Sequence, residues 1–217
     1  MRKLIRGIVD YRNRVRPIAR ETFARLALGQ SPDVLFIACS DSRVAINVFA
    51  STEPGDLFVV RNPGNIVSPA AADGLSVADE SEAAAIEFAV GQLQVKDIIV
   101  CGHSSCGAMG ALLRGRENLN AAPHLRSWLR HAERALERVA DPTGPGAVDQ
   151  LSQQNALLQL EHLLTYPIVE EAVRRKALRL HSFWFDIANA EVLVHDASAG
   201  RFIPLDEQQA ARLEPES

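Results

Sequence analysis

Short apolar runs alternate with longer stretches of helical periodicity along this chain. Four runs are apolar at nearly every position, which favours strands covered on both faces over strands with one face in water. The predicted strands span residues 34–38, 57–60, 97–101 and 177–185, and a further edge strand spans 191–195. This alternation predicts an α/β protein with parallel strands.

Apolar residues at three- and four-residue spacing predict helices between these strands. The expected helices span residues 81–93, 105–113, 125–139 and 148–164, and residues 69–78 are expected to form a loop. The arginine-rich start of the chain predicts an amphipathic helical arm over residues 1–28. Asp10 and Glu21, with no apolar segment and small-residue cleavage site after them, argue against a transit peptide.

The composition limits the class of protein. With 217 residues, 47% of them hydrophobic, the chain can form one substantial core, so a single domain over residues 1–217 is expected. A net charge of -4 argues against a general binder of nucleic acid or membrane surfaces, and no apolar run is long enough for a membrane span. Three cysteines are too few for a disulfide framework but suit a metal site in a reducing compartment, so a cytoplasmic protein is expected.

Two motifs carry the candidate chemistry. Cys39-Ser40-Asp41-Ser42-Arg43 follows the first predicted strand, and Cys101-Gly102-His103-Ser104-Ser105-Cys106 follows the third. In an open parallel sheet, ligands bind outside the carboxyl ends of the strands. The two motifs are therefore expected to meet at one site.

The residue types in these motifs favour zinc. Two thiolates and one imidazole, from Cys39, Cys106 and His103, leave one tetrahedral position vacant. A purely structural site would have a fourth Cys or His, whereas here Asp41 lies close in sequence to its own cation, Arg43. The fourth position is expected to take water, whose pKa zinc lowers toward about 7, or Asp41 in a closed state after its release by Arg43.

Two other interpretations of the motifs remain open. A zinc site that only stabilises a binding protein needs neither Asp41 nor Arg43, and a metal-free Cys39 nucleophile with His103 as base leaves Cys106 unexplained. Outside the site, Cys101 is expected to be a buried small apolar residue. His181 is expected to be a satisfied core histidine, and surface or capping roles are expected for His124, His131, His162 and His195.

These residues resemble the β-class carbonic anhydrases, in particular plant enzymes and bacterial members of the cyanate-operon type. The likeness extends from about Gln30 to Pro204 and depends most on the two cysteine motifs with Arg61-Asn62-Pro63-Gly64-Asn65 between them. It implies reversible hydration of carbon dioxide to bicarbonate and a proton by a zinc-bound hydroxide, with one zinc ion per chain. The implied zinc ligands are Cys39, His103 and Cys106, with Asp41 and Arg43 as a gating dyad.

The resemblance also implies a fold and a substrate pocket. The implied fold is a four-stranded parallel sheet core with an added antiparallel edge strand, flanked by helices, with an extended N-terminal helix. The pocket positions correspond to Gln30, Phe58, Phe88 and Gly107, and Phe88 stands where tyrosine is common.

Some family members have a second, inhibitory bicarbonate pocket lined by a tryptophan and a tyrosine. Phe36 and Phe185 stand at those positions, so this pocket is not expected here. Two further departures are Ile46 in place of a frequent proline and Ser182 in place of a usual glycine.

The resemblance implies a homodimer or homotetramer in which the N-terminal helix extends over the partner. The amphipathic arm is compatible with that arrangement, since a long helix with nothing else to pack on needs a partner surface. Hydrolysis of carbon disulfide or carbonyl sulfide at the same zinc site is the alternative activity that the resemblance leaves open.

Overall fold

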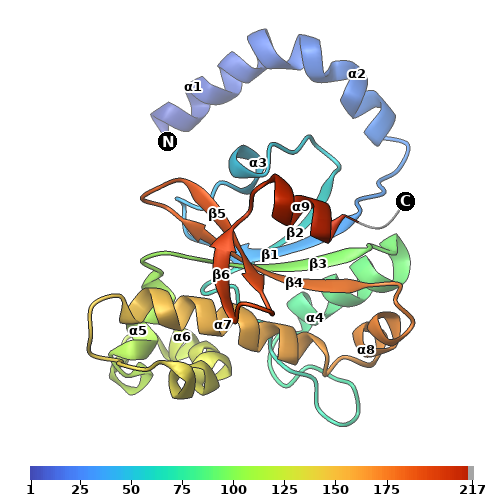
Figure 1. The fold of residues 1–217 in the computed structure, drawn as a ribbon. Helices are drawn as coiled ribbons and strands as arrows, with labels where there is room; N and C mark the ends of the chain where they lie inside the picture. The colour runs from blue at the N-terminus through green and yellow to red at the C-terminus, as the bar shows by residue number, and fades with distance from the viewer. Residues whose placement is uncertain (215–217) are drawn as a thin grey trace.

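A six-stranded sheet forms the centre of the computed structural model, which describes residues 1–214 (Figure 1). The strand order is β2-β1-β3-β4-β5-β6. The strands are β1 (Val34–Cys39), β2 (Leu57–Asn62), β3 (Asp97–His103), β4 (Arg179–Asp186), β5 (Glu191–Asp196) and β6 (Arg201–Pro204). The first four are parallel and the last two are antiparallel, which confirms the predicted parallel core with an antiparallel edge.

The antiparallel edge has two strands where one was expected. Strand β6 was missed because only Phe202 and Ile203 of its four residues are apolar, and Pro204 ends the run. Phe202 packs edge-on against His195 of β5, so a short hairpin covers what would otherwise be the open edge of β4.

The most buried strands bring the two motifs together. After their first residues, β1 is fully buried and β3 nearly so, as their continuous apolar sequences require. Ala38 pairs with Cys101, and Cys39 pairs with Asn62 of β2. The carboxyl ends of three parallel strands therefore lie side by side at one edge of the sheet.

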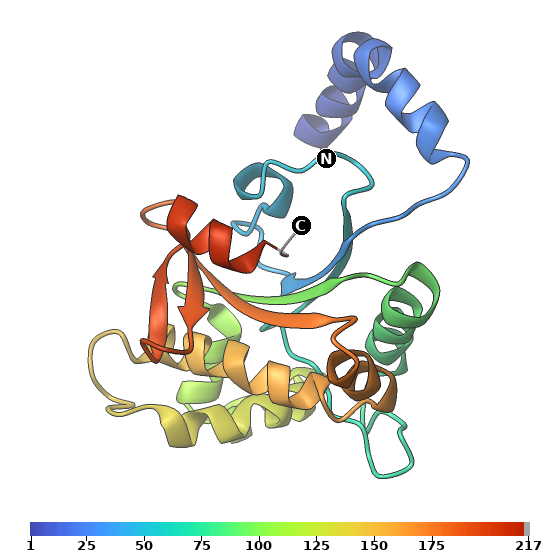
Figure 2. The same cartoon turned by 45° about the vertical axis from the view of Figure 1, so that its right-hand side comes forward.

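Helices cover both faces of this sheet (Figures 1 and 2). One face carries α4 (Glu80–Glu87), α5 (Gly107–Leu113), α6 (Pro123–Trp128), α7 (Ala147–Leu163) and α8 (Pro167–Arg174). A π-helical turn over Phe88–Leu93 continues α4, and a 3-10 helix over Leu129–Arg138 continues α6. The four internal helices predicted from periodicity are all present, whereas the short α8 was not predicted, nor were α3 (Ile46–Phe49) and α9 (Glu207–Leu213) of the other face.

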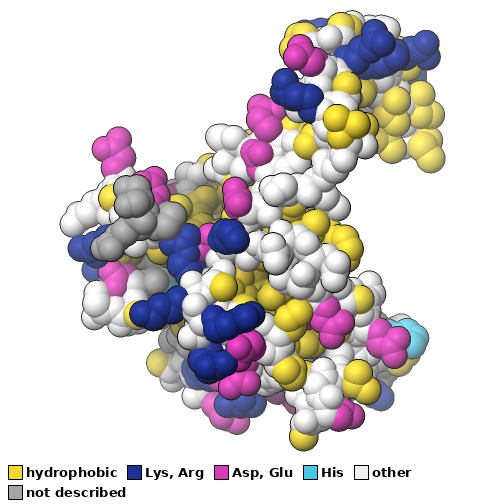
Figure 3. All heavy atoms as spheres, turned by 90° about the vertical axis from the view of Figure 1, so that its right-hand side faces the viewer, with side chains coloured by type: hydrophobic (Ala, Val, Ile, Leu, Met, Phe, Trp, Pro, Cys, Tyr) yellow, Lys and Arg dark blue, Asp and Glu magenta, His cyan; other side chains and the backbone are white. Residues whose placement is uncertain are grey.

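The N-terminal arm is helical, as predicted. Helices α1 (Arg2–Asp10) and α2 (Arg16–Leu26) are joined by a π-helical segment, Tyr11–Val15, and none of these residues is buried. The arm arches away from the sheet and exposes both basic and apolar side chains (Figures 2 and 3). Leu4, Ile5 and Ile8 are among the exposed apolar residues. Within residues 1–214, no helix combines the length and apolar character of a membrane span.

Two of the histidine predictions were wrong. His131 and His162 are buried, because each lies on the side of its helix that packs against the body. His124 is exposed and His195 is half-buried on β5. His181 is a satisfied histidine, since its Nε2 lies 2.7 Å from Asp97 Oδ1. Cys101 is fully buried, as expected.

Candidate metal centre

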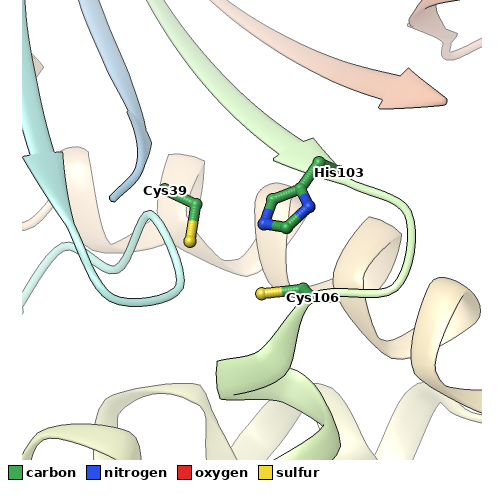
Figure 4. Close-up of side chains that lie close together, drawn as sticks. All are labelled: Cys39, His103 and Cys106. Atoms are coloured by element: carbon green, nitrogen blue, oxygen red, sulfur yellow. The ribbon is translucent and has the colours of Figure 1, made fainter. Parts of the chain in front are cut away.

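Three buried side chains converge at the carboxyl ends of β1 and β3 (Figure 4). Cys39 is the last residue of β1, His103 is the last residue of β3, and Cys106 caps the start of α5. Their ligand atoms all lie within 4.8 Å of one another. The structure thus brings together the three ligands predicted from the sequence.

Local backbone geometry explains why β3 and α5 both reach this point. Ser105 has φ of 53°, in the left-handed region, and this turn reverses the chain between His103 and Cys106. Gly102 approaches α7 so closely that a Cβ atom there would lie 3.0 Å from the Ser152 carbonyl oxygen. A side chain at position 102 would therefore push β3 away from α7 and displace His103.

One orphaned nitrogen shows that a cation fits this site. His103 Nδ1 lies 2.9 Å from the Ser104 carbonyl oxygen, so it carries the ring proton and leaves a lone pair on Nε2. Nε2 is buried and has no hydrogen-bond partner. A buried imidazole nitrogen facing two sulfur atoms is the donor set that zinc prefers, and the ring is already fixed by its other nitrogen.

A shared proton couples the two cysteine sulfurs and favours a thiolate at Cys39 but not at Cys106. The pKa of Cys39 is lowered chiefly because its sulfur accepts a hydrogen bond from Cys106, and also because it accepts one from the Gly64 N–H, against the opposing effect of burial. The pKa of Cys106 rises because it donates to Cys39 and is itself buried. The Ala108 and Met109 N–H groups at the start of α5 act in the opposite direction on Cys106. The pair therefore holds a proton between two sulfurs that a cation would displace.

The carboxylate beside the ligands is held by its own arginine. Arg43 Nε donates to Asp41 Oδ1 at 2.9 Å, and one terminal Arg43 nitrogen donates to Asp41 Oδ2 at 2.7 Å. These bonds hold the pKa of Asp41 well below its usual range, so the carboxylate stays ionised. Asp41 Oδ2 lies 4.0 Å from His103 Nε2, and the same Arg43 nitrogen also donates to the Ser105 carbonyl oxygen at 3.1 Å. Arg43 therefore joins the two motifs while it keeps the carboxylate beside the ligands.

Arg61 and Asn62 also shape the site, although no individual role was predicted for them from the sequence. Arg61 donates to the carbonyl oxygens of Cys39 and Asp41, at 2.7 and 2.8 Å, and so fixes the backbone on both sides of Ser40. Asn62 exchanges two hydrogen bonds with the backbone of Ile66 and closes the loop that carries Gly64. The available signal was the Arg61–Asn65 segment, which identified the resemblance but not these contacts.

Only one of the four predicted substrate-pocket residues lies beside the metal ligands of its own chain. Gly107 follows Cys106 directly, and a Cβ atom there would meet nothing within 4 Å. Phe58 pairs with Leu35, four residues before Cys39, so about 13 Å of strand separates it from the ligand end. Its ring lies 5.8 Å from that of Phe88, and Gln30 lines a surface hollow with Phe23 and Pro54. Gln30, Phe58 and Phe88 are therefore not part of the ligand cluster of their own chain.

Comparisons with known proteins agree with this geometry. A family profile described as carbonic anhydrase matches residues 34–192. A carbonic anhydrase from Pseudomonas aeruginosa is 39% identical over 215 residues, covering 98% of this chain and 95% of the relative.

Two solved structures extend the likeness to the fold. The structure of the β-carbonic anhydrase CcaA superposes with a TM-score of 0.87 at 37% identity, covering 96% of this chain and 93% of that one. A structure from a study of two tetrameric β-carbonic anhydrases of Sordaria macrospora superposes with a TM-score of 0.72 at 31% identity, covering 94% and 98%. By its sequence, its fold and its Cys-His-Cys site, the chain belongs to the β-carbonic anhydrase family.

Proposed function

We propose that this chain hydrates carbon dioxide reversibly to bicarbonate and a proton at a zinc ion bound by Cys39, His103 and Cys106. The observation that carries the proposal is the unpartnered His103 Nε2 facing two cysteine sulfurs beside the ionised Asp41. When bound, zinc lowers the pKa of water toward about 7 and so supplies a nucleophile near neutral pH. Cys39 and Cys106 must stay reduced to bind it, which supports a cytoplasmic location.

Asp41 and Arg43 are proposed to control the fourth position of this site. While Arg43 donates to both carboxylate oxygens, Asp41 would be held beside the ligands, where it could accept a hydrogen bond from a water at the zinc and orient that water. Without Arg43, Asp41 Oδ2 has only about 4 Å to cross to the ligand cluster and becomes a competing ligand. The dyad thus keeps the site open only while the ion pair is intact.

The remaining pocket residues are proposed to act across an interface between two copies of the chain. Phe88 is 42% exposed although it pairs with Phe58, and the N-terminal arm buries none of its apolar residues. Two such surfaces on one chain favour a homodimer or homotetramer in which Gln30, Phe58 and Phe88 complete the metal site of a second copy. The two rings would supply a dry wall for a nonpolar gas.

Elemental analysis combined with stopped-flow hydration of carbon dioxide tests the proposal. We expect one zinc ion per chain, and we expect Cys106→Ala to lose most of its metal and its activity. Cys101→Ala is the matched control, because Cys101 is an equally buried thiol of β3 outside the ligand cluster. Full zinc occupancy in Cys106→Ala would contradict the ligand assignment.

The same preparations should be assayed with carbon disulfide and carbonyl sulfide. Turnover of either substrate, with no hydration of carbon dioxide, would replace the proposed activity by the hydrolase alternative. Bound zinc with no turnover of any of the three substrates would favour a zinc-stabilised binding protein.

A further inference from the structure

Helix α7 presents polar side chains to the metal centre. Asp149, Ser152 and Asn155 are spaced at three-residue intervals and so lie along one side of the helix. Ser152 is 1% exposed and Asn155 is fully buried, at positions where a core helix normally places apolar side chains. Burial of unpaired polar groups costs free energy, so their hydrogen-bond partners indicate why they are there.

Asp149 contacts the segment that carries Cys106. Its Oδ1 accepts a hydrogen bond from the Ser105 N–H at 2.6 Å. Ser105 is the residue with left-handed backbone geometry between His103 and Cys106, a conformation that an L-residue adopts only when its surroundings stabilise it. Asp149 on one side of this turn and Arg43 on the other together fix it.

Ser152 contacts the segment that carries His103. Its hydroxyl donates to the His103 carbonyl oxygen at 2.8 Å and accepts from the His103 N–H at 3.2 Å. It also accepts from Trp184 Nε1 at 3.2 Å. The Ser152 hydroxyl therefore uses its one donor and both of its lone pairs. Two of these three hydrogen bonds fix the backbone of His103.

Asn155 contacts the segment that lies against Cys39. Its Nδ2 donates to the Gly64 carbonyl oxygen at 2.9 Å, and the N–H of the same Gly64 donates to Cys39 Sγ at 3.3 Å. Gln159, one turn further along α7, donates to Asn155 Oδ1 at 2.7 Å and fixes the orientation of the amide. Asn155 therefore fixes, through one glycine, the hydrogen bond that Cys39 accepts.

We propose that Asp149, Ser152 and Asn155 are positioning residues that set the geometry of the metal site before the metal arrives. Ser152 contacts the backbone of His103 at the end of β3, and Asp149 contacts Ser105 just before Cys106. Asn155 contacts Gly64 in the loop after β2, and the N–H of Gly64 donates to Cys39 at the end of β1. A rigid helix that contacts all three reduces the reorganisation that metal binding would otherwise require. The inference depends on the proposed zinc site but not on the reaction performed there.

Zinc affinity of the full-length protein, measured by competition with a chelator, tests the inference. Outer contacts of this kind typically change metal affinity by about 10- to 100-fold, so we expect Ser152→Ala and Asn155→Leu each to bind zinc about 10- to 100-fold more weakly. Asp149→Ala should weaken binding in the same way. Asp149→Asn, which keeps an oxygen for the Ser105 N–H, should recover most of the affinity.

Tyr166→Phe is the matched control for a general loss of stability. It removes one buried hydrogen bond, from the Tyr166 hydroxyl to the Ser68 carbonyl oxygen, close to the end of the same helix but away from every ligand segment. It should lower the melting temperature and leave zinc affinity within about twofold of the parent, a difference of well under 1 kcal/mol.

A spectroscopic measurement separates positioning from stability. In the cobalt-loaded protein, Asn155→Leu should move the sulfur-to-metal charge-transfer band to lower energy, because Cys39 Sγ loses the hydrogen bond from Gly64 that stabilises its electrons. Tyr166→Phe should leave this band unchanged.

The inference is overturned if Ser152→Ala and Asn155→Leu bind zinc as tightly as Tyr166→Phe and the cobalt band does not move. If one of these variants fails to fold, the comparison of Asp149→Ala with Asp149→Asn decides by itself. A parent protein that binds zinc tightly but hydrates no carbon dioxide would refute the proposed function and leave this inference standing.

Discussion

Replacement of Glu82 by glutamine is expected to stabilise the protein at neutral and alkaline pH. Glu82 lies in the first turn of α4 and is only 3% exposed. One carboxyl oxygen accepts from the Ser68 N–H at 3.1 Å, and the other lies 3.5 Å from Asn62 Nδ2. No cation lies among these partners, so the buried carboxyl has little to compensate an ionised state.

The structure gives the sign and the size of the effect. Burial, with a smaller contribution from Asp79, raises the pKa of Glu82 from 4.5 to about 8. Because the folded state binds the proton more tightly than the unfolded chain, stability is complete below pH 4.5 and is lost as the pH rises toward about 8. At about 1.4 kcal/mol for each pH unit, the loss reaches about 3 kcal/mol at neutral pH.

Glutamine removes this dependence without removing the main contact. The amide oxygen of the glutamine can accept the hydrogen bond from the Ser68 N–H. The amide nitrogen takes the place of the carboxyl oxygen that lies 3.5 Å from Asn62 Nδ2, so only this long contact is lost. We therefore expect Glu82→Gln to be more stable than the parent by about 2 to 4 kcal/mol near pH 7.5, and by only about 1.4 kcal/mol near pH 5.5.

Urea unfolding across this pH range, at fixed protein and zinc concentrations, measures the difference. Glu80→Gln is the control, because Glu80 is an exposed carboxyl of the same helical turn. A difference between Glu82→Gln and the parent that stays constant with pH, or that grows toward acid, would refute the reasoning.

Four further predictions concern the gate, acid stability, inhibition and the pH dependence of activity. Arg43→Ala should retain its zinc by elemental analysis but lose hydration activity by about 100-fold or more, since Asp41 is then free to bind the metal. Activity within about twofold of the parent would show that the Asp41–Arg43 pair is only structural. Burial lowers the pKa of His131 from 6.5 to about 4, so its contribution to stability is complete above pH 6.5 and is lost as the pH falls toward 4. Between these two pH values the melting temperature of His131→Phe should therefore fall less than that of the parent. An equal fall in both proteins would contradict this assignment. Phe36 and Phe185 flank Phe49 in an apolar cluster and offer no polar atoms, so steady-state hydration should show ordinary product inhibition by bicarbonate, and a Hill coefficient clearly above 1 would be the contrary result. Hydration rates should rise between about pH 6 and about pH 9, because the attacking water must first lose a proton; a flat stopped-flow profile would contradict this mechanism.

The sequence predicts the convergence of Cys39, His103 and Cys106 well, because both motifs are local and lie at the ends of predicted strands. Continuous apolar runs identify β1 and β3, and the rule for the carboxyl ends of parallel strands then brings Cys39 and His103 together. The Asp41–Arg43 pair is separated by a single residue, so its contact needs no knowledge of the fold. These parts of the site depend on short-range patterns.

The parts that were missed depend on contacts between distant residues. Nothing in the α7 sequence indicates that Asn155 contacts Gly64, 91 residues earlier, or that His162 contacts the Val67 carbonyl oxygen, 95 residues earlier. His162 was therefore expected at the surface, since a polar residue on a helix is usually exposed. The short β6 and α9 lack the length that periodicity needs, so they also could not be predicted.

The late position of α7 in the chain has a consequence for how the protein is made. Cys39, His103 and Cys106 are synthesised before residues 147–163, and β4, which pairs with β3, follows only afterwards. During that interval Cys39 and Cys106 belong to a nascent chain whose supporting helix does not yet exist, while loop closure over 49 to 91 residues still lies ahead. The Cys-His-Cys site therefore reaches its final geometry only after the second half of the chain has folded around it, and the thiols must remain reduced until then.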